Sequence, residues 1–111
     1  MWHEGEDAAA RWYLDRGYRV LSRNWRCPLG ELDLVLARGS EVVFCEVKAR
    51  RDSVLGAGYE AVTRDKQRRL RALAQAFCAT EHPAAGHYRF DVASVTVRSE
   101  GVDVYVFEDA F

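Results

Sequence analysis

Two apolar stretches separated by a short polar segment dominate the middle of the chain. They cover residues 31–37 and 42–48, and the connecting loop places Gly39 before Ser40 at its centre. A two-residue loop with glycine first is typical of a β-hairpin with a type II′ turn. Both faces of the two strands are largely apolar, which predicts central strands covered on both sides.

Helical periodicity marks two further segments. Residues 4–16 present a broad apolar face, and Gly17 follows as a helix stop. Thr63 is a suitable N-cap for a second helix that runs to about residue 80. The buried stripe of this helix is predicted to contain Leu70, Leu73, Ala74 and Phe77.

The remaining segments are interpreted as strands and connections. Residues 18–25 alternate as a strand, and residues 26–30 form a turn. Two more strands are predicted over 88–97 and 102–108, whereas residues 50–61 contain two glycines and are predicted to form a loop.

The predicted elements follow the order α-β-β-β-α-β-β. A helix between the third and fourth strands permits a parallel crossover, and the short connections elsewhere favour antiparallel pairs. The chain has 111 residues, too few for two independent cores. We therefore predict one α/β domain over residues 1–111, with a mixed five-stranded sheet flanked by helices.

Composition narrows the class of protein. Hydrophobic residues make up 49% and charged residues 30%, a balance typical of a globular domain. No apolar run approaches the about 20 residues needed to span a bilayer, and the acidic start is unlike a signal peptide. Three cysteines without a close pair indicate a reducing environment, so we expect a cytoplasmic protein without a membrane partner.

Charge is distributed unevenly along the chain. The net charge is −1, but residues 11–71 carry a net charge of +6 and residues 72–111 a net charge of −4. A basic middle segment is suited to phosphate. The same arginines also fit a plain solvated surface, and charge alone leaves both interpretations open.

The hairpin brings acidic side chains together. A two-residue loop at its tip places Asp33 opposite Glu46 and Glu31 opposite Lys48. Directly opposed residues share a face, with Cβ atoms about 4.5–5.5 Å apart. The other face is then uncharged and consists of Leu32, Leu34, Leu36, Val43, Cys45 and Val47.

Two opposed carboxylates between buried strands repel each other unless a cation lies between them. Mg²⁺ binds carboxylate oxygens at about 2.0–2.1 Å, so Asp33 and Glu46 are candidate ligands of one ion. Lys48 adds a positive charge on the same side. The alternative is a solvated charged end of the hairpin, in which Lys48 simply pairs with Glu31.

Asp33, followed by Glu46-Val47-Lys48 on the next strand, resembles the D…E-x-K core of the restriction-endonuclease-like (PD-(D/E)XK) nucleases. Along nearly the whole chain, the sequence is similar to the uncharacterised bacterial YraN-like proteins, predicted nucleases related to Holliday-junction resolvases. The matching segments are Gly5-Glu6-x-x-Ala9-Ala10-x-x-Tyr13-Leu14, Gly17-Tyr18, Arg23-Asn24-x-Arg26, Gly30-Glu31-Leu32-Asp33-Leu34, Phe44-Cys45-Glu46-Val47-Lys48-x-Arg50, Lys66, Arg89-Phe90-Asp91-Val92 and Ala110-Phe111.

The resemblance implies a restriction-endonuclease-like fold and specific roles for four residues. Asp33 and Glu46 would bind Mg²⁺ or Mn²⁺, and Lys48 would orient or activate the attacking water or stabilise charge at phosphorus. Glu6, on the first helix, would add a metal or water contact. Leu32 stands where these nucleases often have a proline before the motif aspartate.

Several cations are candidate nucleic-acid contacts. Arg50 and Arg51 directly follow the strand that carries Glu46, and Arg69 belongs to a basic cluster at the start of the second helix. Lys66 lies on the apolar stripe of that helix, which favours either a side chain aimed at the site or a lysine that extends to solvent. Asp91 is interpreted as a structural partner of an arginine such as Arg89.

Two classes of function follow from these observations. The first is a metal-dependent endonuclease that acts on DNA, including branched or flapped DNA, for which a homodimer would be one way to hold two duplex arms. The second is a catalytically silent nucleic-acid-binding or partner-recruiting module with the same fold. The combination of Asp33, Glu46 and Lys48 favours the first class.

Overall fold

The computed structural model describes residues 4–51 and 62–111. These residues form α1 (Glu4–Leu14), β1 (Arg19–Cys27), β2 (Gly30–Arg38), β3 (Glu41–Arg51), α2 (Arg64–Glu81), β4 (His87–Arg98) and β5 (Gly101–Phe107). The predicted α-β-β-β-α-β-β order is confirmed. The third strand is longer than predicted, since residues 50 and 51 belong to β3, and the rest of the predicted loop at 50–61 lies outside the described residues.

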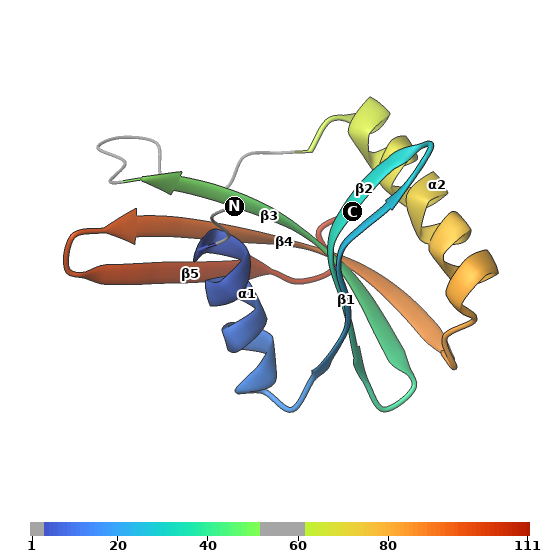
Figure 1. Ribbon diagram of the computed structural model, residues 1–111, viewed down its shortest axis with the longest axis horizontal. Helices are drawn as coiled ribbons and strands as arrows, with labels where there is room; N and C mark the ends of the chain where they lie inside the picture. Colours follow the sequence, from blue (N-terminus) through green and yellow to red (C-terminus); the bar gives the residue numbers. More distant parts are fainter. Residues whose placement is uncertain (1–3, 52–61) are drawn as a thin grey trace.

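The five strands form one mixed sheet in the order β1-β2-β3-β4-β5 (Figure 1). The β3–β4 pair is parallel, and the other three pairs are antiparallel. Parallel neighbours need a long crossover connection, and α2 lies within it. The predicted mixed sheet with a single parallel pair is therefore confirmed.

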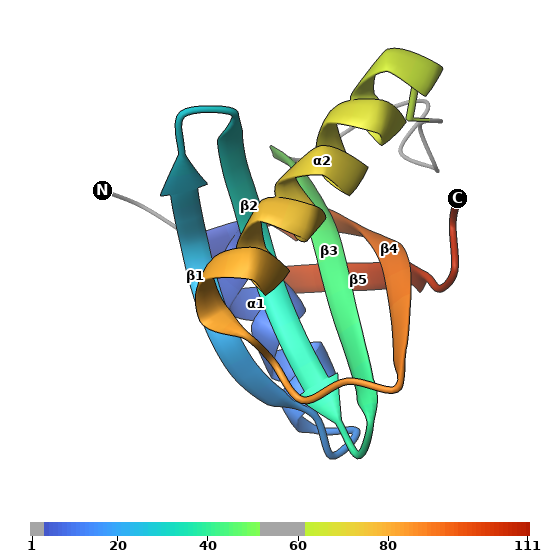
Figure 2. The same ribbon diagram turned by 90° about the vertical axis from the view of Figure 1, so that its right-hand side faces the viewer.

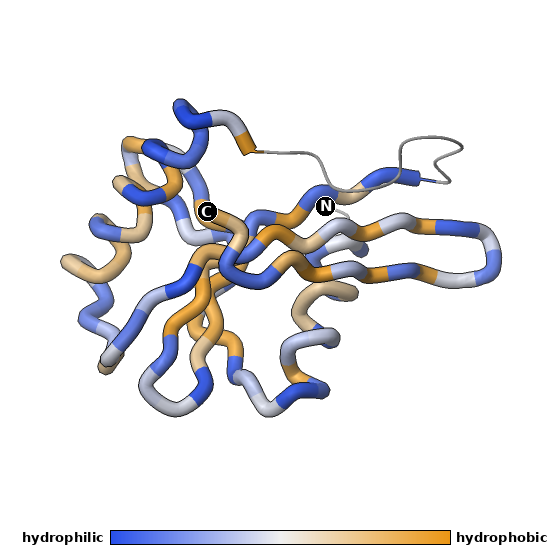
Figure 3. Tube along the Cα trace, turned by 180° about the vertical axis from the view of Figure 1, so that it is seen from behind, coloured by the Kyte–Doolittle hydropathy of each residue, from blue (hydrophilic) through white to orange (hydrophobic). Residues whose placement is uncertain are grey.

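The two helices lie on opposite faces of the sheet (Figure 2). Tyr13, Leu36 and Val43 belong to the apolar cluster on the α1 side, whereas Phe44 and Leu73 belong to the cluster on the α2 side. Hydrophobic residues are concentrated where the strands cross between the helices (Figure 3). The middle strands are thus covered on both sides, as their two apolar faces predict. Neither described helix combines the length and apolarity needed to cross a membrane.

The β2–β3 hairpin has the predicted register. Its pairs run from Arg38 opposite Glu41 to Leu34 opposite Cys45, with a two-residue loop between the strands. Gly39, at the first loop position, has a φ of +60°, in the left-handed region that glycine adopts without strain. The turn therefore determines which side chains of the two strands face each other.

The start of β2 departs from the prediction. Glu31 pairs with Arg26 of β1, at 3.1 Å between Oε2 and Nε, so the predicted pairing with Lys48 is wrong. Leu32 packs in the α2-side cluster and Leu34 in the α1-side cluster, so the prediction that they share a face is also wrong. The β2–β3 pairing ends at Leu34 and Cys45, whereas β1 stays paired with β2 as far as Gly30, so the start of β2 follows β1 and not β3.

A buried polar network ties α1 to β4. Asp91 is 0% exposed, and its carboxylate accepts hydrogen bonds from the Tyr13 hydroxyl at 2.5 Å and from Arg89 Nε at 2.8 Å. The backbone N–H of Asp109 donates a further bond at 2.9 Å. The interpretation of Asp91 as a structural partner of Arg89 is confirmed, and the network holds α1 against the sheet.

Candidate carboxylate site between β2 and β3

Asp33 lies where β2 and β3 part. The strand pairing ends at Leu34 and Cys45, one position before the direct Asp33–Glu46 pair that the hairpin register predicts. Instead of a backbone pair, a side-chain hydrogen bond joins the two strands here: Asp33 Oδ2 accepts from the Val47 backbone N–H at 2.8 Å. The carboxylate is thereby held beside Glu46 at a gap in the sheet.

Helix α1 brings a third carboxylate to this gap. A Cβ added to Gly5 would lie only 2.6 Å from the Ala49 Cβ, so α1 approaches β3 more closely there than a side chain would allow. Glu6 follows directly, and its charge acts on Asp33. The structure thus places Glu6 close enough for its charge to act on Asp33, and the metal or water contact implied for Glu6 stays a prediction.

Asn24 of β1 is a site residue that sequence reasoning did not single out. Its Nδ2 donates to Glu6 Oε1 at 2.9 Å. The residues before and after Asn24 pair with Leu34 and Leu32 of β2, so Asn24 is opposite Asp33. The φ of Asn24 is +53°. Asparagine tolerates this left-handed conformation better than most residues, and the match at Arg23-Asn24-x-Arg26 was the available signal.

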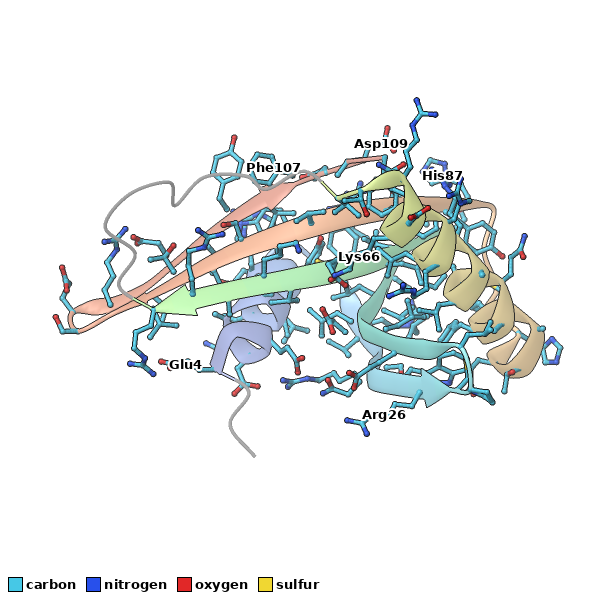
Figure 4. All side chains as sticks on the ribbon, turned by 90° about the horizontal axis from the view of Figure 1, so that it is seen from above. Glu4, Arg26, Lys66, His87, Phe107 and Asp109 are labelled. Carbon is cyan, nitrogen blue, oxygen red and sulfur yellow. The ribbon has the colours of Figure 1, made fainter. Side chains whose placement is uncertain are left out.

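Lys66 reaches the site from α2. Its Nζ lies 2.5 Å from Glu46 Oε2, and the Glu46 side chain is only 12% exposed. Thr63 caps the helix, since its Oγ1 accepts from the Lys66 backbone N–H at 3.2 Å, which orients the first turn toward β3. Lys66 lies over β3 in Figure 4. Of the two interpretations left open for Lys66, the structure supports a side chain aimed at the site.

The electrostatics of the gap disfavour the ionised form of Asp33. Burial, first, and the negative charges of Glu46 and Glu6 raise the pKa of Asp33 from 3.8 to about 7. The hydrogen bond from the Val47 N–H opposes this rise without cancelling it. A carboxyl group whose surroundings disfavour its ionised form is typical of a binding or catalytic site.

The other predicted cations lie around the carboxylates. Arg69 lines the same surface cavity of about 290 Å³ as Asp33, Glu46 and Lys66. Lys48 lies two residues beyond Glu46 on β3, and among the described residues none forms an ion pair with it. The proposed alternative pairing of Lys48 with Glu31 is therefore absent from the described part of the chain.

Two further cations lie at the α1 end of the site. Arg50 and Arg51 line a cavity of about 280 Å³ together with Glu4 and Glu6. This cavity and the one that holds Asp33 lie on either side of the β3 segment that follows Glu46. The phosphate contacts predicted for Arg50, Arg51 and Arg69 stay predictions.

The donor set fits a hard divalent cation. Within residues 4–51 and 62–111, no group of three or more His, Cys, Asp or Glu side chains could hold a metal ion by itself. Mg²⁺, however, commonly takes only one or two carboxylates from a protein and completes its shell with waters and substrate phosphates. Asp33 and Glu46 supply that pair of oxygen ligands, so the residues present fit Mg²⁺ or Mn²⁺.

Fold and site together define an α/β protein with a mixed five-stranded sheet and paired carboxylates where two adjacent strands part. The chain belongs to the uncharacterised protein family UPF0102, which matches residues 5–95. This confirms the resemblance to the YraN-like proteins. The UPF0102 protein of Moorella thermoacetica is 45% identical over 104 residues, covering 90% of this chain and 87% of that protein.

Similarity extends over most of the chain in other relatives as well. The UPF0102 protein of Caldicellulosiruptor saccharolyticus is 39% identical over 111 residues, covering 98% of this chain and 94% of that protein. That of Frankia casuarinae is 49% identical over 98 residues, covering 87% and 82% respectively. These relatives therefore match the domain as a whole, including the strands that carry Asp33 and Glu46.

Proposed function

We propose that the protein is a metal-dependent endonuclease that hydrolyses phosphodiester bonds in DNA, including branched DNA. The observation that carries the proposal is the partly buried Asp33 carboxyl, which the Val47 N–H holds at 2.8 Å beside Glu46 at the gap between β2 and β3. Neither the twist of the sheet nor the packing of its apolar side chains requires two carboxylates at this position. The resemblance of Asp33 and Glu46-Val47-Lys48 to the restriction-endonuclease-like core supports the same assignment.

Each residue of the site has a distinct task in this proposal. Asp33 and Glu46 bind the cation, which when bound supplies charge neutralisation and lowers the pKa of a nearby water. Lys48 holds the attacking water or stabilises negative charge on the phosphate. Lys66 neutralises Glu46 before the cation binds. Glu6, which accepts a hydrogen bond from Asn24, adds a metal or water contact from the side of α1.

The basic side chains around the site would position the DNA backbone. Arg50, Arg51 and Arg69 flank the carboxylates on two sides, and cations at such places contact phosphates without reading base sequence. Cys27, Cys45 and Cys78 are free thiols, and we propose that the enzyme acts in the cytoplasm, where thiols stay reduced.

Cleavage of a panel of linear, flapped and four-way DNA with Mg²⁺ or Mn²⁺ tests the proposal. We expect Asp33→Asn to lower the cleavage rate by at least about 100-fold. Asp103→Asn is the matched control, because it removes one exposed carboxylate from β5, which β4 separates from β3. Equal rates for the wild type and Asp33→Asn would reject the catalytic assignment.

The same panel distinguishes the alternative function. A catalytically silent module would bind DNA in a salt-dependent manner without cleaving it. Its binding would be unchanged by Asp33→Asn in the absence of divalent cations. The ion pair of Lys66 with Glu46 is the feature that favours this alternative, since it partly satisfies the site without a metal.

A further inference from the structure

The sheet extends beyond α2 on the face that carries Glu46. Figure 4 looks onto this face and shows α2 over one part of the sheet and no described helix over the outer parts of β3, β4 and β5. One row of residues crosses these strands next to the carboxylates. Lys48 of β3 is opposite Ser94 of β4, which is opposite Tyr105 of β5.

This row belongs to the α2 side of the sheet. Val92, two residues before Ser94, and Phe107, two residues after Tyr105, both pack against the α2-side cluster. Alternation along a strand places residues two apart on the same face. The neighbouring row is Glu46, Val92 and Phe107, so the row of Lys48 continues the surface of the carboxylate site.

Tyr105 is the unusual member of the row. It is 64% exposed, the largest exposure among the large hydrophobic residues of the described chain. Its ring lies against Phe107, with centroids 4.6 Å apart. An exposed aromatic ring at this position adds little to the core, which points to a role in binding.

The surface next to Tyr105 has the character of a nucleic-acid platform. Strand spacing of about 4.8 Å places the Tyr105 Cα about 10 Å from that of Lys48. Ser94 lies between them in the row and is only 8% exposed, so Lys48 and Tyr105 are the side chains that a ligand would meet. Single-stranded nucleic acids bind where cations follow the backbone and aromatic rings stack on bases.

Charge on the surface is compatible with this ligand. Asp103 is the nearest acid on β5, and it is paired with Arg98 at 2.7 Å. A second copy of the chain that added a strand to β5 would use the backbone edge of that strand. The Tyr105 ring instead lies on the face of the sheet, which favours a base stacked on it over a strand paired beside it.

We propose that Tyr105 stacks on an unpaired base next to the scissile phosphate, so that the substrate is DNA with a single-stranded segment at a branch or flap. The proposal rests on the proposed function for the position of that phosphate. Lys48 contacts the backbone between the base and the carboxylates. Tyr105 is thus a specificity-determining residue and takes no part in bond cleavage.

Binding of a fluorescent oligothymidylate, measured by anisotropy in EDTA, tests the proposal without any cleavage. We expect Tyr105→Ala to weaken binding by about 5- to 150-fold, the range for losing one stacked base, and Tyr105→Trp to retain it. Tyr88→Ala is the matched control, because Tyr88 is a 48% exposed tyrosine on β4 outside the row. Blunt duplex DNA should bind Tyr105→Ala and the wild type equally.

The outcomes separate this proposal from the nuclease assignment. Equal oligothymidylate binding by Tyr105→Ala and the wild type, or no binding by either, would overturn the stacking role. So would a wild-type dimer that Tyr105→Ala converts to a monomer with unchanged oligonucleotide affinity, since the ring would then serve a protein interface. A failure of the wild type to cleave any DNA would reject the nuclease while the binding comparison still decides the role of Tyr105.

Discussion

Replacing Asp33 by asparagine should stabilise the protein at alkaline pH while it removes a proposed metal ligand. The two side chains have nearly the same shape, and the asparagine Oδ1 can still accept the hydrogen bond from the Val47 N–H. What the substitution removes is a partly buried negative charge beside Glu46 and near Glu6. Sites arranged for function often carry such a penalty in stability.

The raised pKa sets both the sign and the size of the effect. In the folded protein Asp33 titrates at about 7, whereas its ordinary value is 3.8. Between these values the folded state binds more protons than the unfolded state, so stability falls as pH rises. The full penalty, reached above pH 7, is about 4 kcal/mol. Burial of the asparagine amide offsets part of the gain, which leaves about 1–3 kcal/mol.

Urea denaturation of the metal-free wild type and Asp33→Asn at pH 5 and pH 8.5 measures this difference. We expect the advantage of the variant to widen by about 2–3 kcal/mol between the two values, because the cost of burying the amide is the same at both. Mg²⁺ at pH 8.5 should stabilise the wild type and leave the variant unchanged. Parallel pH profiles for the two proteins would refute the argument that a buried, repelled charge is present at residue 33.

Three further substitutions test the contacts that hold the site and helix α1 in place. Lys66→Met should lower stability by about 1 kcal/mol in EDTA, since a half-buried carboxylate loses its cation, and Mg²⁺ should restore it; a deficit insensitive to Mg²⁺ would contradict this. Gly5→Ala should lower the free energy of unfolding by about 1–3 kcal/mol because its Cβ would meet Ala49, and an unchanged urea midpoint would show that α1 has room. Asp91→Asn should destabilise by about 3 kcal/mol, since Arg89 loses a buried partner, whereas a wild-type melting curve would argue against the network.

Local chemistry made the central hairpin predictable. A glycine-serine loop between two apolar stretches sets the register as far as Leu34 and Cys45, and this brings Asp33 and Glu46 to the point where the strands part. The stripe on α2 was equally clear, because Leu70 and Leu73 recur at helical spacing. These features depend on neighbours in the sequence, so a single chain was enough to find them.

The shape of the gap depends on distant contacts and could not be predicted in the same way. The pairing of β2 with β3 ends before Glu31 would meet Lys48, and Glu31 stays paired with β1, but no residue pattern marks the point where the pairing ends. Asn24 matters through its backbone conformation and its bond to Glu6, both set by how α1 packs. Hydrophobic periodicity contains no information on such placements.

The central claim is that Asp33 and Glu46 bind one divalent cation. Binding of Mn²⁺ measured by electron paramagnetic resonance tests it most directly, in the wild type, Asp33→Asn and the control Asp103→Asn. The account predicts one Mn²⁺ per chain that Mg²⁺ displaces, retained in Asp103→Asn and lost in Asp33→Asn. No bound Mn²⁺ in the wild type, or equal binding by all three proteins, would contradict it.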